Sequence, residues 1–190
     1  MKAVFGFGAV VAVAFVGWQF ASAQMMGHDQ MHARMHGPGG MGHDETTMPG
    51  LRGLNASPEE SEELAVMFRD FQSITRTVEN LPNGIRTVTS STNPDVMAAL
   101  VSHVVGMIDR VEAKDDPQIM IQSPTLDIFF ERAERLETTV DVTDDAIVVL
   151  QTSTDPQLVE AMHKYAAEVS AMALRGMDAV HDMMMQRMGG

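Results

Sequence analysis

The chain has 190 residues, no cysteine and a formal net charge of −13. Its length suits one ordinary domain with a tail. The absence of cysteine excludes a disulfide framework and zinc sites built from thiolates, and the acidic charge argues against nucleic-acid binding, which requires a basic surface.

The first 23 residues carry the pattern of a secretory signal peptide. An apolar run of about fifteen residues follows the positive start at Lys2, and Ala21-Ser22-Ala23 forms an A-x-A cleavage motif. The run is shorter than the roughly twenty residues that a transmembrane helix needs. We therefore expect cleavage after Ala23, a periplasmic or secreted protein that begins at Gln24, and no membrane association after cleavage. The alternative is an uncleaved amphiphilic anchor.

Residues 24–56 are predicted to form a disordered tail, because Gly and Pro interrupt them and apolar β-branched residues are absent. Six Met and four His stand between Gln24 and Met48. Thioether sulfur is a soft ligand and imidazole a borderline one, so together they suit Cu(I) and Cu(II). Nickel, zinc or silver binding, or a linker without a metal, are the alternatives. The candidate ligands are Met25, Met26, His28, Met31, His32, Met35, His36, Met41, His43 and Met48.

An ordered domain is predicted from residue 57 to residue 176. Ser57 can cap a helix, Pro58 suits the first helical turn, and Glu60 stands three residues after the cap, which together form the capping-box pattern. Apolar residues at helical spacing continue to Phe71. We therefore expect a helix of about fifteen residues here, since this spacing places the apolar side chains on one face.

A β-hairpin and a second helix follow in the sequence. Residues 74–89 alternate in polarity on either side of Asn83-Gly84, which is a strong hairpin signal. Asn93-Pro94 then starts a helix whose wide apolar stripe extends to Val111. Lys114-Asp115-Asp116-Pro117 ends this helix. The predicted order is therefore helix, hairpin, helix.

This segment resembles the one that follows it at an offset of 62 residues. Ser91-Thr92-x-Pro94 aligns with Ser153-Thr154-x-Pro156 without gaps. Units of about 64–114 and 126–176 predict an α+β fold with two layers, a mostly antiparallel four-stranded sheet with helices on one face, built by internal duplication. Two unrelated strand–turn–helix units are the alternative. If the repeat holds, the buried positions are Ile74, Val78, Ile85 and Val88, with their equivalents Leu136, Val140, Ile147 and Leu150.

A last helical element is predicted from about Pro156 to Arg187, with a break near Gly176. After the break, residues 177–190 are rich in methionine. Packing or self-association through this segment is one interpretation, because methionine fills irregular gaps. Metal binding is the other. The candidate ligands lie at spacings that place them on one face of a helix, and they are Met177, His181, Met184 and Met188.

Two side chains inside the domain define a second candidate site. His103 and Tyr165 stand at equivalent positions of the repeat, so they can face a shared pocket that binds a small ligand, a metal or haem. A hydrogen-bonded core histidine and a partly buried tyrosine are the alternative. We expect His163 at the surface. The sequence has no nucleophile elbow, zincin, Walker A or dinucleotide-binding motif, so no enzyme activity is expected.

The phrase ITRTVENLPNGIRTVTSSTNP and its repeat VDVTDDAIVVLQTSTDP resemble an uncharacterised group of exported bacterial proteins. The resemblance covers residues 64–175. Members of that group commonly carry a histidine at the position of Tyr165 and another near Phe71, so the resemblance implies that this chain lacks two internal ligands. Its tails are similar to those of Met/His-rich periplasmic copper-binding proteins.

These patterns predict a periplasmic copper-binding protein that buffers, detoxifies or delivers Cu(I) or Cu(II) through clustered Met and His ligands. The expected partners are copper ions and another periplasmic copper protein, and the sequence is compatible with an oligomer. One alternative is a small-ligand or haem-binding sensor domain that uses His103 and Tyr165. Another is an interaction module whose Met-rich end docks a partner.

Overall fold

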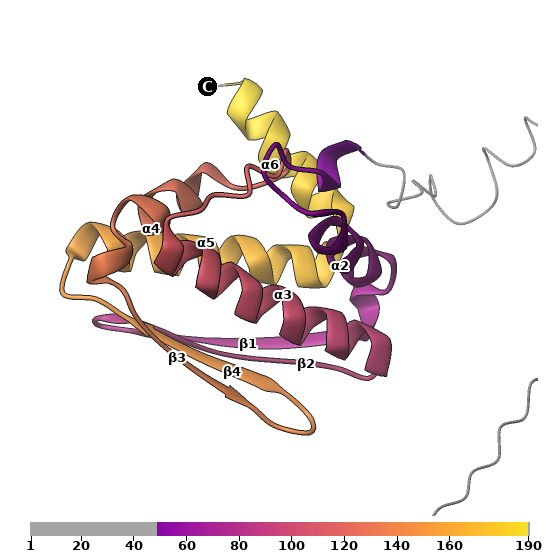
Figure 1. The fold of residues 1–190 in the computed structure, drawn as a ribbon, viewed down its shortest axis with the longest axis horizontal. Coiled ribbons are helices and arrows are strands. Elements are labelled where there is room, and N and C mark those ends of the chain that lie inside the picture. Colours follow the sequence, from indigo (N-terminus) through magenta and orange to yellow (C-terminus); the bar gives the residue numbers. More distant parts are fainter. Residues whose placement is uncertain (1–48, 190) are drawn as a thin grey trace, which may run out of the picture. The chain divides into compact units, whose positions relative to one another are not determined.

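A four-stranded antiparallel sheet forms one layer of the structure, and helices cover one of its faces (Figure 1). The computed structural model describes residues 49–189. The predicted α+β class is confirmed, and all neighbouring strands are antiparallel. The helices and strands are α2 (Pro58–Arg69), β1 (Ile74–Leu81), β2 (Gly84–Ser91), α3 (Pro94–Ala113), α4 (Asp127–Glu131), β3 (Glu137–Val142), β4 (Ile147–Thr152), α5 (Pro156–Arg175) and α6 (Met177–Met188). Short 3-10 helices lie at η1 (Pro49–Leu51), η2 (Phe71–Ser73), η3 (Pro124–Leu126) and η4 (Ala133–Arg135).

Local signals start the helices where the sequence predicts them. At α2 the Glu60 amide donates to Ser57 Oγ over 3.2 Å, and the Ser57 amide donates to Glu60 Oε2 over 2.7 Å, which completes the predicted capping box. Asn93 caps α3 and Asp155 caps α5, each through a side-chain oxygen and each before a proline. Helix α2 ends at Arg69 and is shorter than predicted, because the chain leaves the helix there and enters η2.

The strand order β1-β2-β4-β3 places β2 and β4 at the centre of the sheet. The hairpins β1–β2 and β3–β4 meet through this central pair, in which Thr87 lies opposite Val149. A hairpin alone is at best marginally stable in water, so the central pairing makes the four strands one sheet with a single face to cover. The predicted turn lies at Pro82 and Asn83, directly before β2 begins at Gly84.

The two halves of the domain have matching elements at the offset of 62 residues. Helices α3 and α5 hold 20 residues each and start at equivalent positions. Val78 lies opposite Thr87 in the first hairpin, and Val140 lies opposite Val149 in the second. In the central pair Thr87 faces its own equivalent, Val149, so an approximate twofold axis passes between β2 and β4. An internal duplication as the origin of this correspondence stays a prediction.

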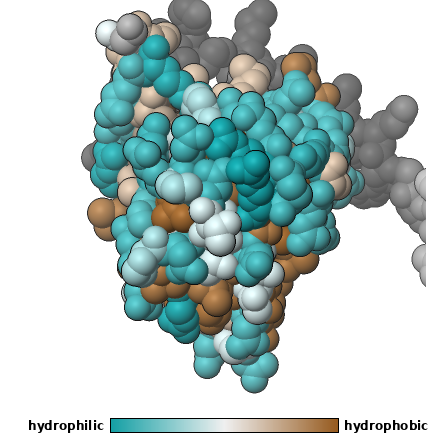
Figure 2. All heavy atoms as spheres, turned by 90° about the vertical axis from the view of Figure 1, so that its left-hand side faces the viewer, coloured by the Kyte–Doolittle hydropathy of each residue, from teal (hydrophilic) through white to brown (hydrophobic). Residues whose placement is uncertain are grey.

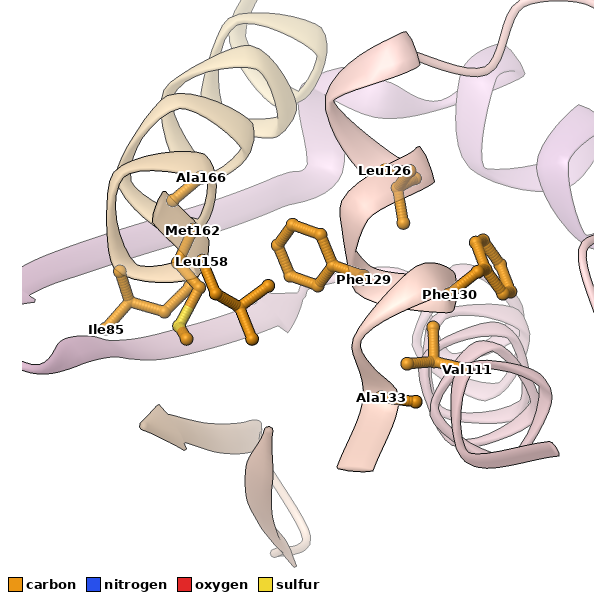
Figure 3. Close-up of a cluster of buried hydrophobic side chains, with 9 residues drawn as sticks. All are labelled: Ile85, Val111, Leu126, Phe129, Phe130, Ala133, Leu158, Met162 and Ala166. Atoms are coloured by element: carbon orange, nitrogen blue, oxygen red, sulfur yellow. The ribbon is translucent and has the colours of Figure 1, made fainter. Parts of the chain in front are cut away.

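Helix α5 packs on the first hairpin and on α4 (Figure 3). Leu158, Met162 and Ala166 of α5 are fully buried and lie in one cluster with Ile85 of β2 and Phe129 of α4. The three α5 residues are four positions apart, so they form one face of the helix. Truncating a large side chain in such a cluster costs about 2–5 kcal/mol, and this cluster therefore holds α5 on the sheet.

His163 connects α5 to the first hairpin, although we expected it at the surface. Its side chain is half-buried, and its Nε2 donates to the carbonyl oxygens of Leu81 over 3.0 Å and Gly84 over 2.9 Å. The expectation was wrong because helical spacing alone does not show that the end of a distant hairpin lies beside this part of α5.

The ordered domain begins earlier than predicted. We expected the tail to extend to residue 56, but Pro49–Leu51 forms η1, and Leu51 is buried among side chains of α2 and α6. Gly53 forms a β-bridge with Ile119. The composition of this segment was misleading, because the residues that bury it come from distant parts of the chain.

Burial in the central strands follows the alternation of a sheet with one covered face. Ile85, Thr87 and Thr89 are buried beneath the helices. Of the eight positions that we expected to be buried, Ile85 and Ile147 are buried. Four others are half-buried against the core, namely Ile74, Val78, Leu136 and Val140. For Val88 and Leu150 the expectation was wrong, since Val88 is half-buried on the opposite face and Leu150 is exposed. Side chains of a strand alternate between faces, so Val88, three residues after Ile85, lies on the opposite face.

Polar side chains cover most of the end of the domain that lies at the left of Figure 1, and apolar atoms gather between them in the lower half of this face (Figure 2). The uncovered face of the sheet carries polar residues at alternate positions, such as Thr75, Thr77 and Glu79 of β1, as expected for a solvated face. None of the helices within residues 49–189 combines the length and the apolarity needed to cross a bilayer.

Two glycine substitutions should have opposite effects on stability. In Gly84→Ala the new Cβ would lie 1.9 Å from the carbonyl oxygen of Gln151 on β4, so the central strands would have to separate. We expect the free energy of unfolding to fall by about 2 kcal/mol or more. In Gly106→Ala on α3 the new Cβ meets no atom within 4 Å. This substitution should raise the free energy of unfolding by about 0.5–1 kcal/mol. Urea unfolding measures both, and equal stabilities would contradict the close approach of β2 and β4.

Candidate functional site

The predicted signal peptide and the predicted ligands of the Met/His-rich tail lie outside the described residues. The tail residues concerned are Met25, Met26, His28, Met31, His32, Met35, His36, Met41, His43 and Met48. Their role in metal binding stays a prediction from composition. Within residues 49–189, the candidate sites are a face of α6 and a cavity between the sheet and the helices.

Helix α6 separates the four predicted ligands of the C-terminal cluster. Met177 is partly buried and packs against the core cluster that α2 and η1 share with α6. His181, Met184 and Met188 are exposed, and Met185 is exposed beside them. The first residue of the predicted ligand face is therefore partly buried against the core, while the residues of the later turns are exposed, and their role as metal ligands stays a prediction.

Arg187 holds the exposed end of α6 in place. Its Nη2 donates to the carbonyl oxygen of Gln122 over 2.6 Å and to Met183 Sδ over 3.6 Å. Met184 and Met188 remain exposed to solvent. Within residues 49–189, no group of three or more His, Asp or Glu side chains is arranged to hold a metal ion. The ligands that α6 offers are therefore mainly thioether sulfur atoms.

A cavity of about 270 Å³ lies between the inner face of the sheet and helices α2, α3 and α5. Its walls are largely apolar and include Phe68, Leu100 and Phe129. His103 of α3 and Tyr165 of α5 both line this cavity, so the structure brings the two residues of the second predicted site into one space. The cavity opens partly to solvent, since the exposed Glu112 also lines it, and a largely apolar space with a few polar groups is a candidate binding site.

His103 lines the cavity beside a carboxylate of α2, and its Nδ1 is buried without a hydrogen-bond partner among residues 49–189. Its Nδ1 lies 3.7 Å from Glu63 Oε2, and Ser102 Oγ donates to Glu63 Oε1. The imidazole and the hydroxyl together hold the pKa of the Glu63 carboxyl below its ordinary value. His103 Nδ1 is therefore near a carboxylate but not hydrogen-bonded to it, since 3.7 Å exceeds hydrogen-bond distance.

Tyr165 is half-buried and contributes a hydroxyl group to the cavity. Its ring packs edge-on against Phe129, with ring centroids 5.7 Å apart and 62° between the ring planes. Burial raises the pKa of Tyr165 to about 12, and the nearby Arg76 cation partly opposes this shift. The Tyr165 hydroxyl forms no hydrogen bond with another of residues 49–189. It is therefore an unpaired donor beside a largely apolar space.

Arg76 is a site residue that the sequence analysis did not single out. It lies on the inner face of β1, lines the cavity, and donates from Nη1 to Thr89 Oγ1 over 2.8 Å. Its Nε is buried without a partner, and burial lowers the pKa of the guanidinium. The signal that could have found it is the alternation of β1, where Arg76 shares the inward positions with Ile74 and Val78.

The second half of the domain carries neutral residues at the equivalent positions. Thr138 of β3 and Gln151 of β4 correspond to Arg76 and Thr89, and Gln151 Nε2 donates to Thr138 Oγ1 over 3.4 Å. Thr138 and Gln151 line the same cavity as Arg76 and Thr89. The two halves of the cavity therefore differ in charge: one half carries the half-buried Arg76 cation, and the other carries hydroxyl and amide groups.

No known protein family, no curated protein and no solved structure was found to match this chain. The resemblance to exported bacterial proteins stays a prediction. Function is therefore inferred from the residues of α6 and of the cavity.

Tyr165 is the single tyrosine of the chain, so phenolate absorbance reports on it alone. We expect a titration midpoint of about 12 in the folded protein and about 10 in protein unfolded by denaturant. Folding raises the pKa of Tyr165, so the stabilisation linked to this group is complete at pH values below its unfolded-state pKa. The stabilisation is lost as the pH rises through the folded-state pKa. Arg76→Met should raise the folded midpoint further, since it removes the nearby cation. A folded midpoint equal to the unfolded one would contradict the burial of the hydroxyl.

Proposed function

We propose that this protein binds copper ions through clustered methionine and histidine side chains. The observation that carries the proposal is the exposure of Met184, Met185 and Met188, whose exposed fractions are 39%, 52% and 74%. His181, one turn earlier, is also exposed. Single exposed apolar residues are ordinary, but three thioethers and an imidazole on neighbouring turns of one helix form a set of ligands that packing does not explain.

Copper suits this ligand set better than harder divalent ions do. Thioether sulfur favours Cu(I), and imidazole suits Cu(II) as well as zinc and nickel. The chain has 18 methionines and 7 histidines but no cysteine, so it offers soft sulfur without a thiol that an oxidising compartment would convert to a disulfide. A periplasmic or secreted location, as the predicted signal peptide indicates, is part of the proposal.

The mechanism that we propose is the exchange of copper among several labile sites. Residues three or four positions apart on a helix have Cβ atoms about 5–6 Å apart, so His181 can share a metal ion with Met184 or Met185. Two side chains on a helix surface do not enclose the ion, and further ligands can therefore enter. The Met/His-rich tail would provide more sites of this kind, and a copper protein with a tighter site would receive the metal.

Substitution of the exposed methionines tests this proposal. The triple variant Met184→Leu, Met185→Leu, Met188→Leu keeps the apolar bulk but removes sulfur. We expect its Cu(I) affinity at the α6 site to fall at least tenfold, or about 1.4 kcal/mol, with little change in Cu(II) affinity. His181→Gln should weaken Cu(II) more than Cu(I), because it removes the imidazole. Competition with chromophoric copper chelators measures both affinities.

A matched control and a deletion complete this experiment. Met120→Leu changes a methionine that is 60% exposed but lies outside α6, so it should leave both affinities unchanged. Deletion of residues 25–48 should remove most of the Cu(I) capacity and leave the thermal unfolding transition nearly unchanged, because residues 49–189 contain the packed core. Copper affinities that no variant changes would contradict the proposal. A concentration-dependent mass that only the triple variant loses would assign the methionines to self-association instead.

A further inference from the structure

Arg76 is a half-buried cation whose Nε atom is fully buried, and it has no counter-ion in the described part of the chain. Its Nη1 donates to Thr89, its Nε has no partner, and no carboxylate of residues 49–189 pairs with it. Arg110, by contrast, pairs with Glu60. A buried charge that lacks a partner is strongly unfavourable. Because Arg76 lines a cavity, its guanidinium offers an anion-binding site inside the domain.

The cavity sets the size of the ligand. Its volume is about 270 Å³, while a dry apolar cavity of roughly 150 Å³ binds benzene. In proportion, this cavity accepts about ten non-hydrogen atoms. Haem is several times larger than a ligand of this size, so the cavity volume argues against it. The apolar walls favour a ligand in which most of these atoms are carbon.

The charges around the cavity favour a single negative charge. Among the described lining residues Arg76 is the permanent cation, and the acidic Glu112 is exposed to solvent. A dianion such as a phosphate monoester would keep an uncompensated charge in an apolar space. A carboxylate can accept two hydrogen bonds from one edge of a guanidinium. The unpaired hydroxyl of Tyr165 lies close enough for the Arg76 charge to act on it, and it supplies a further donor.

We propose that the cavity binds a small amphiphilic monocarboxylate, with its carboxylate on Arg76 and its apolar body between the sheet and the helices. Medium-chain fatty acids and arylalkanoic acids both present this chemistry. The apolar body lies along Phe68, Leu100 and Phe129, which line the same space. This site is separate from the exposed methionines of α6 and does not depend on copper binding.

Calorimetric titration of the purified, delipidated protein with three probes tests this site. Octanoate and 1-octanol share one alkyl chain, so the difference between them isolates the carboxylate. We expect saturable binding of octanoate and at least tenfold weaker binding of 1-octanol, because only the carboxylate pairs with Arg76. The third probe, 3-phenylpropanoate, distinguishes the two sources: tighter binding than octanoate indicates an arylalkanoic acid, and weaker binding indicates a fatty acid.

Two arginines on neighbouring strands provide a matched pair of variants. Arg76→Met removes the charge inside the cavity and should lower octanoate affinity at least tenfold without changing 1-octanol affinity. Arg86→Met removes a charge from the exposed face of β2 and should change neither affinity. Arg76→Lys keeps the charge but loses the planar fork, so its octanoate affinity should be intermediate. Arg76→Met should remain folded, because it removes a buried charge that has no carboxylate partner.

Three results would overturn the proposal. The first is no binding of any of the three probes to the parent protein. The second is equal affinity for octanoate and 1-octanol, which would show that the carboxylate is not recognised. The third is an octanoate affinity that Arg76→Met and Arg86→Met change equally, since a general charge effect would then replace the specific contact. If Arg76→Met does not fold, Arg76→Lys replaces it in this comparison. An octanoate affinity that Arg76→Lys and Arg86→Met change equally would then overturn the proposal.

Discussion

The antiparallel pairing of β2 with β4 is the contact on which the rest of the domain depends. It joins two hairpins, each too small to be stable alone, into one sheet with one face that requires cover. Because the two strands run in opposite directions, the helices that follow them, α3 and α5, start from opposite ends of the sheet and cover the same face (Figure 1). The cavity follows from this arrangement, since the inner face of the sheet and these helices line it.

The inner face of the sheet, which lies beneath the helices, carries several polar side chains. Thr87 and Thr89 are buried there, and Arg76 adds a charge. Leucine at these positions would fill more of the cavity, and valine would replace each hydroxyl with a methyl group, so either would bury more apolar surface. A binding site is a physical reason to keep polar groups where packing would be more stable. An ion pair in the proposed carboxylate site would be stronger than one in bulk water, whereas the methionines proposed to bind copper are exposed on α6.

Local sequence signals predicted most of the elements. The Ser57 capping box, the Asn83-Gly84 hairpin signal and the break at Gly176 each depend on a few neighbouring residues, so they can be recognised without tertiary information. At Gly176 the φ of 57° suits glycine, and an added Cβ would lie 2.8 Å from the Phe71 ring. The burial of Leu51 could not be predicted in this way, because its neighbours in space belong to α2, α6 and the loop after α3.

The sequence by itself determined the α+β class, the helix–hairpin–helix order of each half, the helix starts and the soft-ligand composition of both ends, since each of these depends on periodicity, capping or composition. Only the tertiary structure decided which side chains meet: Arg76 shares a cavity with Tyr165, and Met177 is partly buried while Met188 is exposed. The physical reason is that alternation along a strand assigns its side chains to two faces of the sheet but does not determine which face the helices cover. Long-range pairing of β2 with β4, and the helices packed on that pair, make this choice.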